Sequence, residues 1–246
     1  MIRSIALAAL TFATPALAFD IEAMSEPERE AFRAEIRSYL LDNPEVLMEA
    51  IGVLEARDQQ AQASADAEML AALSDDINDD GYSWVGGNPE GDITLVEFMD
   101  YRCGYCRRAF EPVEGLVAED GNIRFVLKEL PILGEQSLLA SQFAIAVKQL
   151  EGDDAYKDVH DALMVMNVDV TEDSLTRLAE GLALDPAPIL ARMDGPEVQA
   201  EIDATRALAT ALQINGTPTF VLADQLVRGF VPAEVMAAEI ARIRGE

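Results

Sequence analysis

The stretch MDYRCGYCRRAF, residues 99–110, contains both cysteines of the 246-residue chain. Cys103 and Cys106 are separated only by Gly104 and Tyr105, so a disulfide between them closes a very short loop. A structural disulfide stabilises a protein mainly by restricting the unfolded chain, and it does so more strongly when the loop is long. The pair therefore indicates redox chemistry rather than a structural cross-link.

The N-terminal sequence MIRSIALAALTFATPALAFD has the features of an export signal. Arg3 precedes an apolar run, and Ala16-Leu17-Ala18 fits the A-x-A cleavage pattern. The run is too short for a bilayer, which takes ~20 apolar residues. We therefore expect residues 1–18 to be a signal peptide cleaved after Ala18, with export to the periplasm, where disulfides persist. A retained N-terminal anchor is the alternative.

The charge balance excludes some partners. The chain has 18 Lys and Arg against 45 Asp and Glu, a formal net charge of −27. Such a surface repels phosphate backbones and anionic lipid headgroups, so we expect no nucleic-acid partner.

Residues 19–80 read as an N-terminal helical arm. Ser25 and Glu28 form a capping-box pattern, and Asn43 with Pro44 starts a second helix. Apolar residues recur at helical spacing in both helices: Phe32, Ile36, Leu40, Leu47, Ile51 and Leu54. The arm has little mass with which to bury these stripes. It therefore either folds back on its own domain or forms a homo-oligomer through residues 20–70.

Residues 81–246 read as one α/β domain that follows a polar break at residues 74–92. A β-branched strand over residues 93–101 leads into a helix that begins at or beside Cys103, and a second strand covers residues 121–132. Helical patterns fill about residues 135–212, and two short strands and a closing helix follow. The order indicates a thioredoxin-like fold with an inserted helical domain.

The position of the cysteine pair has chemical consequences. The thiolate is the reactive form of cysteine, and a helix N-terminus favours an anion. The pKa of Cys103 is therefore expected to be lowered, and Arg102, Arg107 and Arg108 add positive charge unless they are ordinary surface residues. Cys106, one turn inward, is expected to be less exposed and to resolve mixed disulfides.

An acid in the strand before the pair is unusual, because a buried charge is costly unless it is paired. Glu97 is a candidate to take and return the proton of Cys106, with Lys128 as its partner in a proton relay. The alternative is an edge-strand carboxylate that faces water.

No metal and no cofactor are expected. One C-x-x-C motif supplies two zinc ligands, and the only histidine, His160, is far from it in the chain. We interpret His160 as a surface or packing residue.

The motif NGTPTF places Thr217-Pro218 just before a strand. An X-Pro bond adopts the cis form at modest cost, which would turn the Thr217 backbone towards a neighbouring segment. A trans turn is the alternative.

With a signal, C-x-x-C and T-P-T-F in this order, the chain resembles the thioredoxin superfamily. The segments LVEFMDYRCGYCRRA, LKELPILGEQSLLA and NGTPTFVL are similar to DsbA-like thiol–disulfide oxidoreductases, and EIRSYLLDNPEVLMEAI resembles the N-terminal segment of their ScsC-like and Com1-like branch. The resemblance implies that Cys103 is the nucleophile, Cys106 the resolving thiol, Glu97 the buried acid and Thr217-Pro218 a cis-proline loop that faces the pair.

Two departures bear on the direction of the reaction. Gly104-Tyr105 stands where strong oxidases of the family carry Pro-His, and Thr rather than Val precedes the cis proline; both features are similar to the DsbC-type isomerases. Without the histidine the thiolate loses a stabiliser, so the pair should be less oxidising.

The sequence therefore predicts a periplasmic enzyme that exchanges disulfides with exported proteins and with a membrane redox partner, leaning to isomerase or reductase. A disulfide-forming oxidase is one alternative. A chaperone-like binding module with a vestigial pair is another. A protein that binds copper through Cys and Met is a third, although only Met164 and Met166 lie close together in the sequence.

Overall fold

The computed structural model describes residue 21 and residues 23–245, and the chain divides into two compact units after Asp58. The expected signal peptide, residues 1–18, lies outside the described residues. Within the described part, no helix has the length and apolar character needed to cross a membrane.

The first unit is helical, as the sequence predicts. Helix α1 (Glu26–Asp42) begins with the expected capping box between Ser25 and Glu28, and α2 (Glu45–Ala72) begins just after Asn43 and continues into the second unit. No residue of α1 is buried. Large apolar side chains of this unit are instead exposed: Phe32, Ile36, Tyr39, Leu41, Leu47, Met48, Ile51, Val53 and Leu54.

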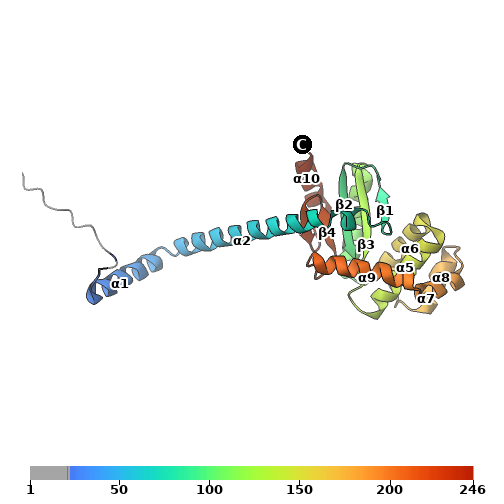
Figure 1. The fold of residues 1–246 in the computed structure, drawn as a ribbon, viewed down its shortest axis with the longest axis horizontal. Helices are drawn as coiled ribbons and strands as arrows, with labels where there is room; N and C mark the ends of the chain where they lie inside the picture. Colours follow the sequence, from blue (N-terminus) through green and yellow to red (C-terminus); the bar gives the residue numbers. More distant parts are fainter. Residues whose placement is uncertain (1–20, 22, 246) are drawn as a thin grey trace, which may run out of the picture. The chain divides into compact units, whose positions relative to one another are not determined.

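The second unit is built around a five-stranded sheet with strand order β1-β3-β2-β4-β5 (Figure 1). In chain order the strands are β1 (Trp84–Gly87), β2 (Ile93–Met99), β3 (Ile123–Glu129), β4 (Thr219–Leu222) and β5 (Gln225–Arg228). Strands β2 and β3 are parallel, and every other pair is antiparallel. The parallel pair requires a crossover, which α4 (Gly104–Asp120) supplies.

One face of the sheet packs against α4 and the closing helix α10 (Ala233–Arg244). Leu95 and Met99 of β2 contribute to this core together with Cys106 and Val113 of α4. Period-2 alternation along β2 sends Val96 and Phe98 to the opposite face.

The opposite face is covered by the end of α2, by α3 (Ser74–Asn78) and by α9 (Pro196–Ala211). Leu70 and Ile77 belong to this core, and Asp66 of α2 binds Arg228 of β5 through two hydrogen bonds of 2.7 and 3.0 Å. The sequence placed the end of the arm at residue 80. The structure instead assigns residues 59–80 to the second unit, because their apolar side chains cover the sheet.

The helical insertion expected over residues 135–212 corresponds to α-helices in the structure. It comprises α5 (Glu135–Glu151), α6 (Asp153–Val165), α7 (Glu172–Gly181), α8 (Pro186–Met193) and α9. Figure 1 shows α5 to α8 gathered beside the sheet, with α9 returning the chain towards β4.

Strand β1 and helix α3 were not predicted, since both lie in the segment interpreted as a break. Two of the four residues of β1 are glycines, which weaken a strand signal. The ring of Trp84 occupies the space of any Cβ at Gly86, with a ring atom 1.9 Å from that position. Gly86 is therefore required by the packing of Trp84 and does not indicate a loop.

We predict that Leu70→Ala lowers the free energy of unfolding by ~2–5 kcal/mol, because it leaves a cavity against the sheet. Leu150→Ala is the matched control, since Leu150 is also helical but 44% exposed, and should change it by less than ~0.5 kcal/mol. Urea unfolding of both variants measures the difference. Equal effects would show that the end of α2 is not part of this core.

Candidate active site

Cys103 occupies the N-cap of α4, as the sequence predicts. Its backbone is extended, with φ −75° and ψ 115°, and its carbonyl accepts the first helical hydrogen bond from the N–H of Arg107 at 3.1 Å. The side chain of Cys103 is 6% exposed, whereas that of Cys106 is fully buried. The outer thiol thus lies beside the unpaired N–H groups of the first helical turn.

The loop that precedes Thr219 brings a distant segment to the pair. The Thr217–Pro218 peptide bond is cis, and the Cys103 Sγ lies 3.0 Å from the carbonyl oxygen of Thr217, to which the protonated thiol donates a hydrogen bond. The structure therefore has the cis form and places Thr217 against the nucleophile candidate.

The pKa values of the two thiols are shifted in opposite directions. Hydrogen bonding from the Cys106 thiol, supported by backbone N–H groups of Tyr105 and Cys106, lowers the pKa of Cys103 to about 5. Burial raises the pKa of Cys106 far above the ordinary thiol value, and the adjacent Cys103 and Glu97 charges act in the same direction. At neutral pH only Cys103 is a thiolate.

Glu97 lies on β2, between β3 and β4, and is 3% exposed. It is therefore a buried acid and not an edge-strand residue facing water. Burial raises the pKa of Glu97 to about 8, and the charges of Glu114 and Cys103 add to the effect. Its Oε1 has no hydrogen-bond partner among the described residues, so a proton acceptor faces the interior near the pair.

Lys128 is not the partner of Glu97, contrary to the prediction. In the parallel register Glu97 lies opposite Leu127, so Lys128 projects to the other face of the sheet. There its ammonium is buried, forms an ion pair with Asp80, and donates to the carbonyl of Asp76 at 2.9 Å. The error arose because neither Asp80 nor the register of β2 and β3 could be placed from the sequence.

The three arginines near the pair are all engaged. The Nε of Arg107 donates to the Tyr101 carbonyl at 2.7 Å, and Arg102 donates to the Val168 carbonyl at 3.3 Å. The guanidinium of Arg108 lies 4.9 Å from the centre of the Phe230 ring. The three arginines therefore help to hold the segment around the cysteine pair in place, in addition to contributing positive charge.

Asp100 was missed by sequence reasoning, although its position directly after a buried strand and before the pair was a usable signal. Its carboxylate is fully buried and accepts three backbone N–H groups, from Arg102 at 2.8 Å, Ile132 at 2.8 Å and Leu133 at 3.1 Å. Asp100 thereby joins the cysteine loop to the segment that follows β3.

A polar network also lies inside this core. Glu129 accepts hydrogen bonds from Tyr101, Tyr156 and Ser141, each at 2.7 Å, and burial raises its pKa to about 7. His160 is 1% exposed and packs against both tyrosines, so it is a packing residue as predicted. Burial lowers the pKa of His160 to about 3. Sequence reasoning did not identify Glu129 or the tyrosines.

The fold and the site define a class: a thioredoxin-fold protein with an acidic outer thiol and a buried inner thiol. Residues 94–241 match the family described as DSBA-like thioredoxin domain, and residues 28–61 match the N-terminal domain of the copper resistance protein ScsC. The chain belongs to the family of DSBA-like thioredoxin domains.

Solved structures agree with this assignment. A thioredoxin-like oxidoreductase from Silicibacter pomeroyi is 44% identical, with a TM-score of 0.65 over 70% of this chain and 98% of that one. Proteus mirabilis ScsC, crystallised in a transitional conformation, is 25% identical with a TM-score of 0.64, over 91% of this chain and 98% of that one. The second likeness includes most of the arm.

Curated relatives match over shorter stretches. Disulfide bond formation protein D of Bacillus subtilis is 24% identical over 156 residues, 58% of this chain and 69% of that protein. The sodium/proton antiporter NhaA 3 of Salinispora tropica is 28% identical over 172 residues, 66% of this chain. The chain spans only 26% of that antiporter's length, so antiport does not carry over to it.

We predict that iodoacetamide alkylates Cys103 rapidly and Cys106 slowly in the reduced protein. The rate at Cys103 should rise to half its maximum near pH 5, following the thiolate fraction, and stay constant above about pH 7. Cys106→Ala removes the largest cause of the lowered pKa and should move this midpoint upward. Peptide mass spectrometry from pH 4 to 8 measures both thiols, and equal rates would contradict the assignment.

We predict that Glu97→Gln stabilises the protein increasingly as pH rises from about 5 to 8. The carboxyl has an ordinary pKa of 4.5 and a folded value of about 8, so the folded protein holds a proton that the unfolded chain releases between these values. Stability is therefore lost as pH rises through this window, and glutamine removes that loss.

Urea unfolding at several pH values measures the effect, with Glu111→Gln on the exposed face of α4 as control. Glu97→Gln should also slow resolution of mixed disulfides, because Cys106 loses its proton acceptor. A pH-independent difference in stability would contradict the buried-acid assignment.

Proposed function

We propose that this protein exchanges disulfides with exported proteins in the periplasm, with Cys103 as nucleophile and Cys106 as resolving thiol, and that it acts as an isomerase or reductase. The observation that carries the proposal is the contrast between the two thiols. Cys103 is acidic, lies at a helix N-terminus and contacts the Thr217 carbonyl, whereas Cys106 is buried and protonated. The predicted signal peptide and the likeness to a periplasmic thioredoxin-like protein of Salmonella enterica support the location.

The first step is attack by the Cys103 thiolate on a substrate disulfide. The substrate S–S bond breaks, a mixed disulfide with Cys103 forms, and one substrate sulfur leaves as thiolate. In isomerisation a second substrate thiolate then attacks the mixed disulfide, which forms a new substrate disulfide and releases Cys103. The enzyme ends in the state in which it began.

Cys106 completes the reductive route. It transfers its proton to the Glu97 carboxylate, attacks the Cys103 sulfur, and displaces the second substrate thiolate, which takes up a proton from the site. Glu97 suits this role because its pKa of about 8 leaves both of its forms accessible near neutral pH.

The direction follows from how strongly the thiolate is stabilised. A pKa of about 5 for Cys103 lies between the ~7 of the reductant thioredoxin and the ~3.5 of the strong oxidant DsbA. Gly104 and Tyr105 add no imidazole to the motif, and His160, the only histidine, is in the core. We therefore place the reduction potential between ~−270 and ~−120 mV, in the range of isomerases. A value near ~−120 mV would favour the oxidase alternative.

We also propose that the protein forms a homo-oligomer through residues 20–70 of the arm. Ile51 and Leu54 of α2 are 46% and 58% exposed and lie on adjacent turns, and burying such residues between copies is favourable. Several catalytic pairs in one assembly act on a tethered substrate at high effective concentration. A membrane redox partner would restore the pair after each reductive turnover.

We predict that the double variant Ile51→Glu, Leu54→Glu is monomeric and loses most of its activity on scrambled substrates, while reduction of a simple disulfide is unchanged. The control Ala56→Glu, Gln60→Glu adds the same charge on the same helix and should keep the oligomer. Light scattering measures the assembly, and refolding of a scrambled protein measures isomerisation.

Cys103→Ala should abolish both redox activities. Retention of refolding assistance by Cys103→Ala would favour the chaperone-like alternative. A wild-type protein that is monomeric at micromolar concentration would refute the role of the arm.

A further inference from the structure

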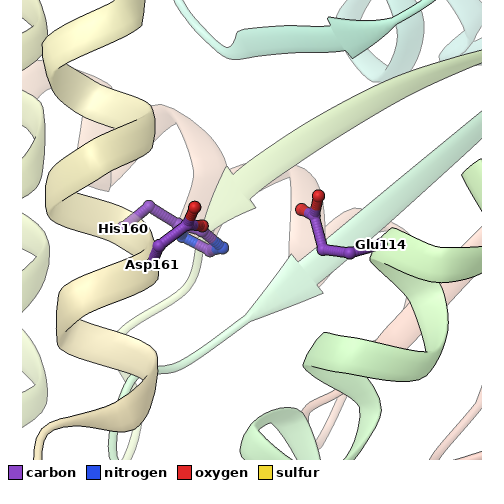
Figure 2. Close-up of side chains that lie close together, drawn as sticks. All are labelled: Glu114, His160 and Asp161. Carbon is purple, nitrogen blue, oxygen red and sulfur yellow. The ribbon is translucent and has the colours of Figure 1, made fainter. Parts of the chain in front are cut away.

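Three potential metal ligands meet at the cysteine helix, and none of them takes part in the bond-making steps of the thiol chemistry. Glu114 lies on α4, and His160 and Asp161 lie on α6. One ligand atom from each lies within 4.8 Å of the others, and Figure 2 shows the three side chains directed into the space between the two helices. These are one nitrogen and two carboxylate ligands.

His160 is held in the form that a metal requires. The hydroxyl proton of Tyr101 is donated to Glu129 at 2.7 Å, so the contact of 3.2 Å between Tyr101 and His160 Nδ1 needs the hydrogen on Nδ1. The other nitrogen, Nε2, then carries the lone pair, and it takes part in no hydrogen bond with the described part of the chain. An imidazole that donates one N–H to a carboxylate-linked group is the usual support of a metal ligand.

The carboxylates are incompletely satisfied and accessible. Glu114 Oε1 is buried and has no hydrogen-bond partner within residues 23–245. The side chains of Glu114 and Asp161 are 31% and 41% exposed, so an ion can reach them from solvent. Zinc binds such ligands at ~2.0–2.2 Å, so the two carboxylates must move inward by about an ångström.

A cation already neutralises this cluster. The Lys157 ammonium lies 2.7 Å from each Asp161 oxygen and 3.4 Å from Glu114. Partly exposed ion pairs of this kind contribute little to stability, so breaking them when a metal ion binds costs little free energy. A hollow of about 420 Å³, lined by Glu114, Lys157, Trp84 and Phe125 among others, gives the Lys157 side chain room to move.

We propose that Glu114, His160 and Asp161 form a binding site for a divalent transition-metal ion, with Lys157 as the competing internal cation. One imidazole and two carboxylates suit zinc and similar borderline ions, with a fourth position open to water. The site contains neither cysteine, although the charge of Glu114 also raises the pKa of Glu97. The sequence does not indicate this site, because only the packing of α4 against α6 brings Glu114 close to His160 and Asp161.

The test uses the untagged full-length protein with Cys103→Ser and Cys106→Ser, so that thiols cannot bind the ion. Zinc is the probe, and calorimetry measures its affinity. In this background Glu114→Gln and Asp161→Asn should each weaken binding at least tenfold. Lys157→Gln should strengthen it severalfold, because the competing ammonium is gone.

Two measurements keep the test specific. Asp158→Asn removes an exposed acid of the same helix and should leave zinc affinity unchanged. Because His160 is the only histidine, zinc should also shift the single imidazole signal in the NMR spectrum. An equal loss in Asp158→Asn and Asp161→Asn, an unmoved imidazole signal, or no binding even in Lys157→Gln would each overturn the proposal.

Discussion

The contact between the Cys103 sulfur and the Thr217 carbonyl is the constraint on which the rest of this structure depends. The two residues are 114 positions apart, and the contact forms only if a helix begins at Cys103 while the cis-proline loop lies beside its first turn. The parallel pairing of β2 and β3 sets the start of α4, and the antiparallel pairing of β4 with β2 sets the loop. The whole helical insertion lies between Cys103 and Thr217 in the sequence. It must therefore bring the chain back to the first turn of α4.

The core around this contact contains ionisable groups on both faces of the sheet. Glu97 faces the cysteine helix, and its Oε1 has no hydrogen-bond partner in the part of the chain that the structure describes, whereas Lys128 faces the opposite side and is paired with Asp80. A buried charge without a partner is costly, so Glu97 holds a proton up to a pKa of about 8. Lys128 therefore stabilises the fold through its ion pair with Asp80, whereas Glu97 is suited to proton transfer.

The last part of α2, which the sequence assigned to the arm, belongs to the second unit. Leu70 and Ile77 cover one face of the sheet, and Asp66 binds the edge strand β5 through Arg228. In the first unit, by contrast, no residue of α1 is buried and the apolar side chains remain exposed. The boundary between the two units therefore falls inside a single helix, α2.

Local patterns determined much of this protein from the sequence alone. Local patterns predicted the capping box at Ser25, the β-branched strand that begins at Ile93, the helix that begins at Cys103 and the helices of the insertion. All depend on neighbours within a few residues, and all are found in the structure. The sequence also made Glu97 a candidate buried acid, because an acid inside an apolar strand is rare, but it left a water-facing position on an edge strand open.

Only the tertiary structure decided the partners of these groups. Lys128 pairs with Asp80, Asp66 with Arg228 and Tyr101 with His160, at separations of 48, 162 and 59 residues. Strand β1 exists because β3 offers it an edge, and its glycine is dictated by the ring of Trp84. Such contacts depend on strand register and helix packing, which the fold sets as a whole and which no short stretch of sequence encodes.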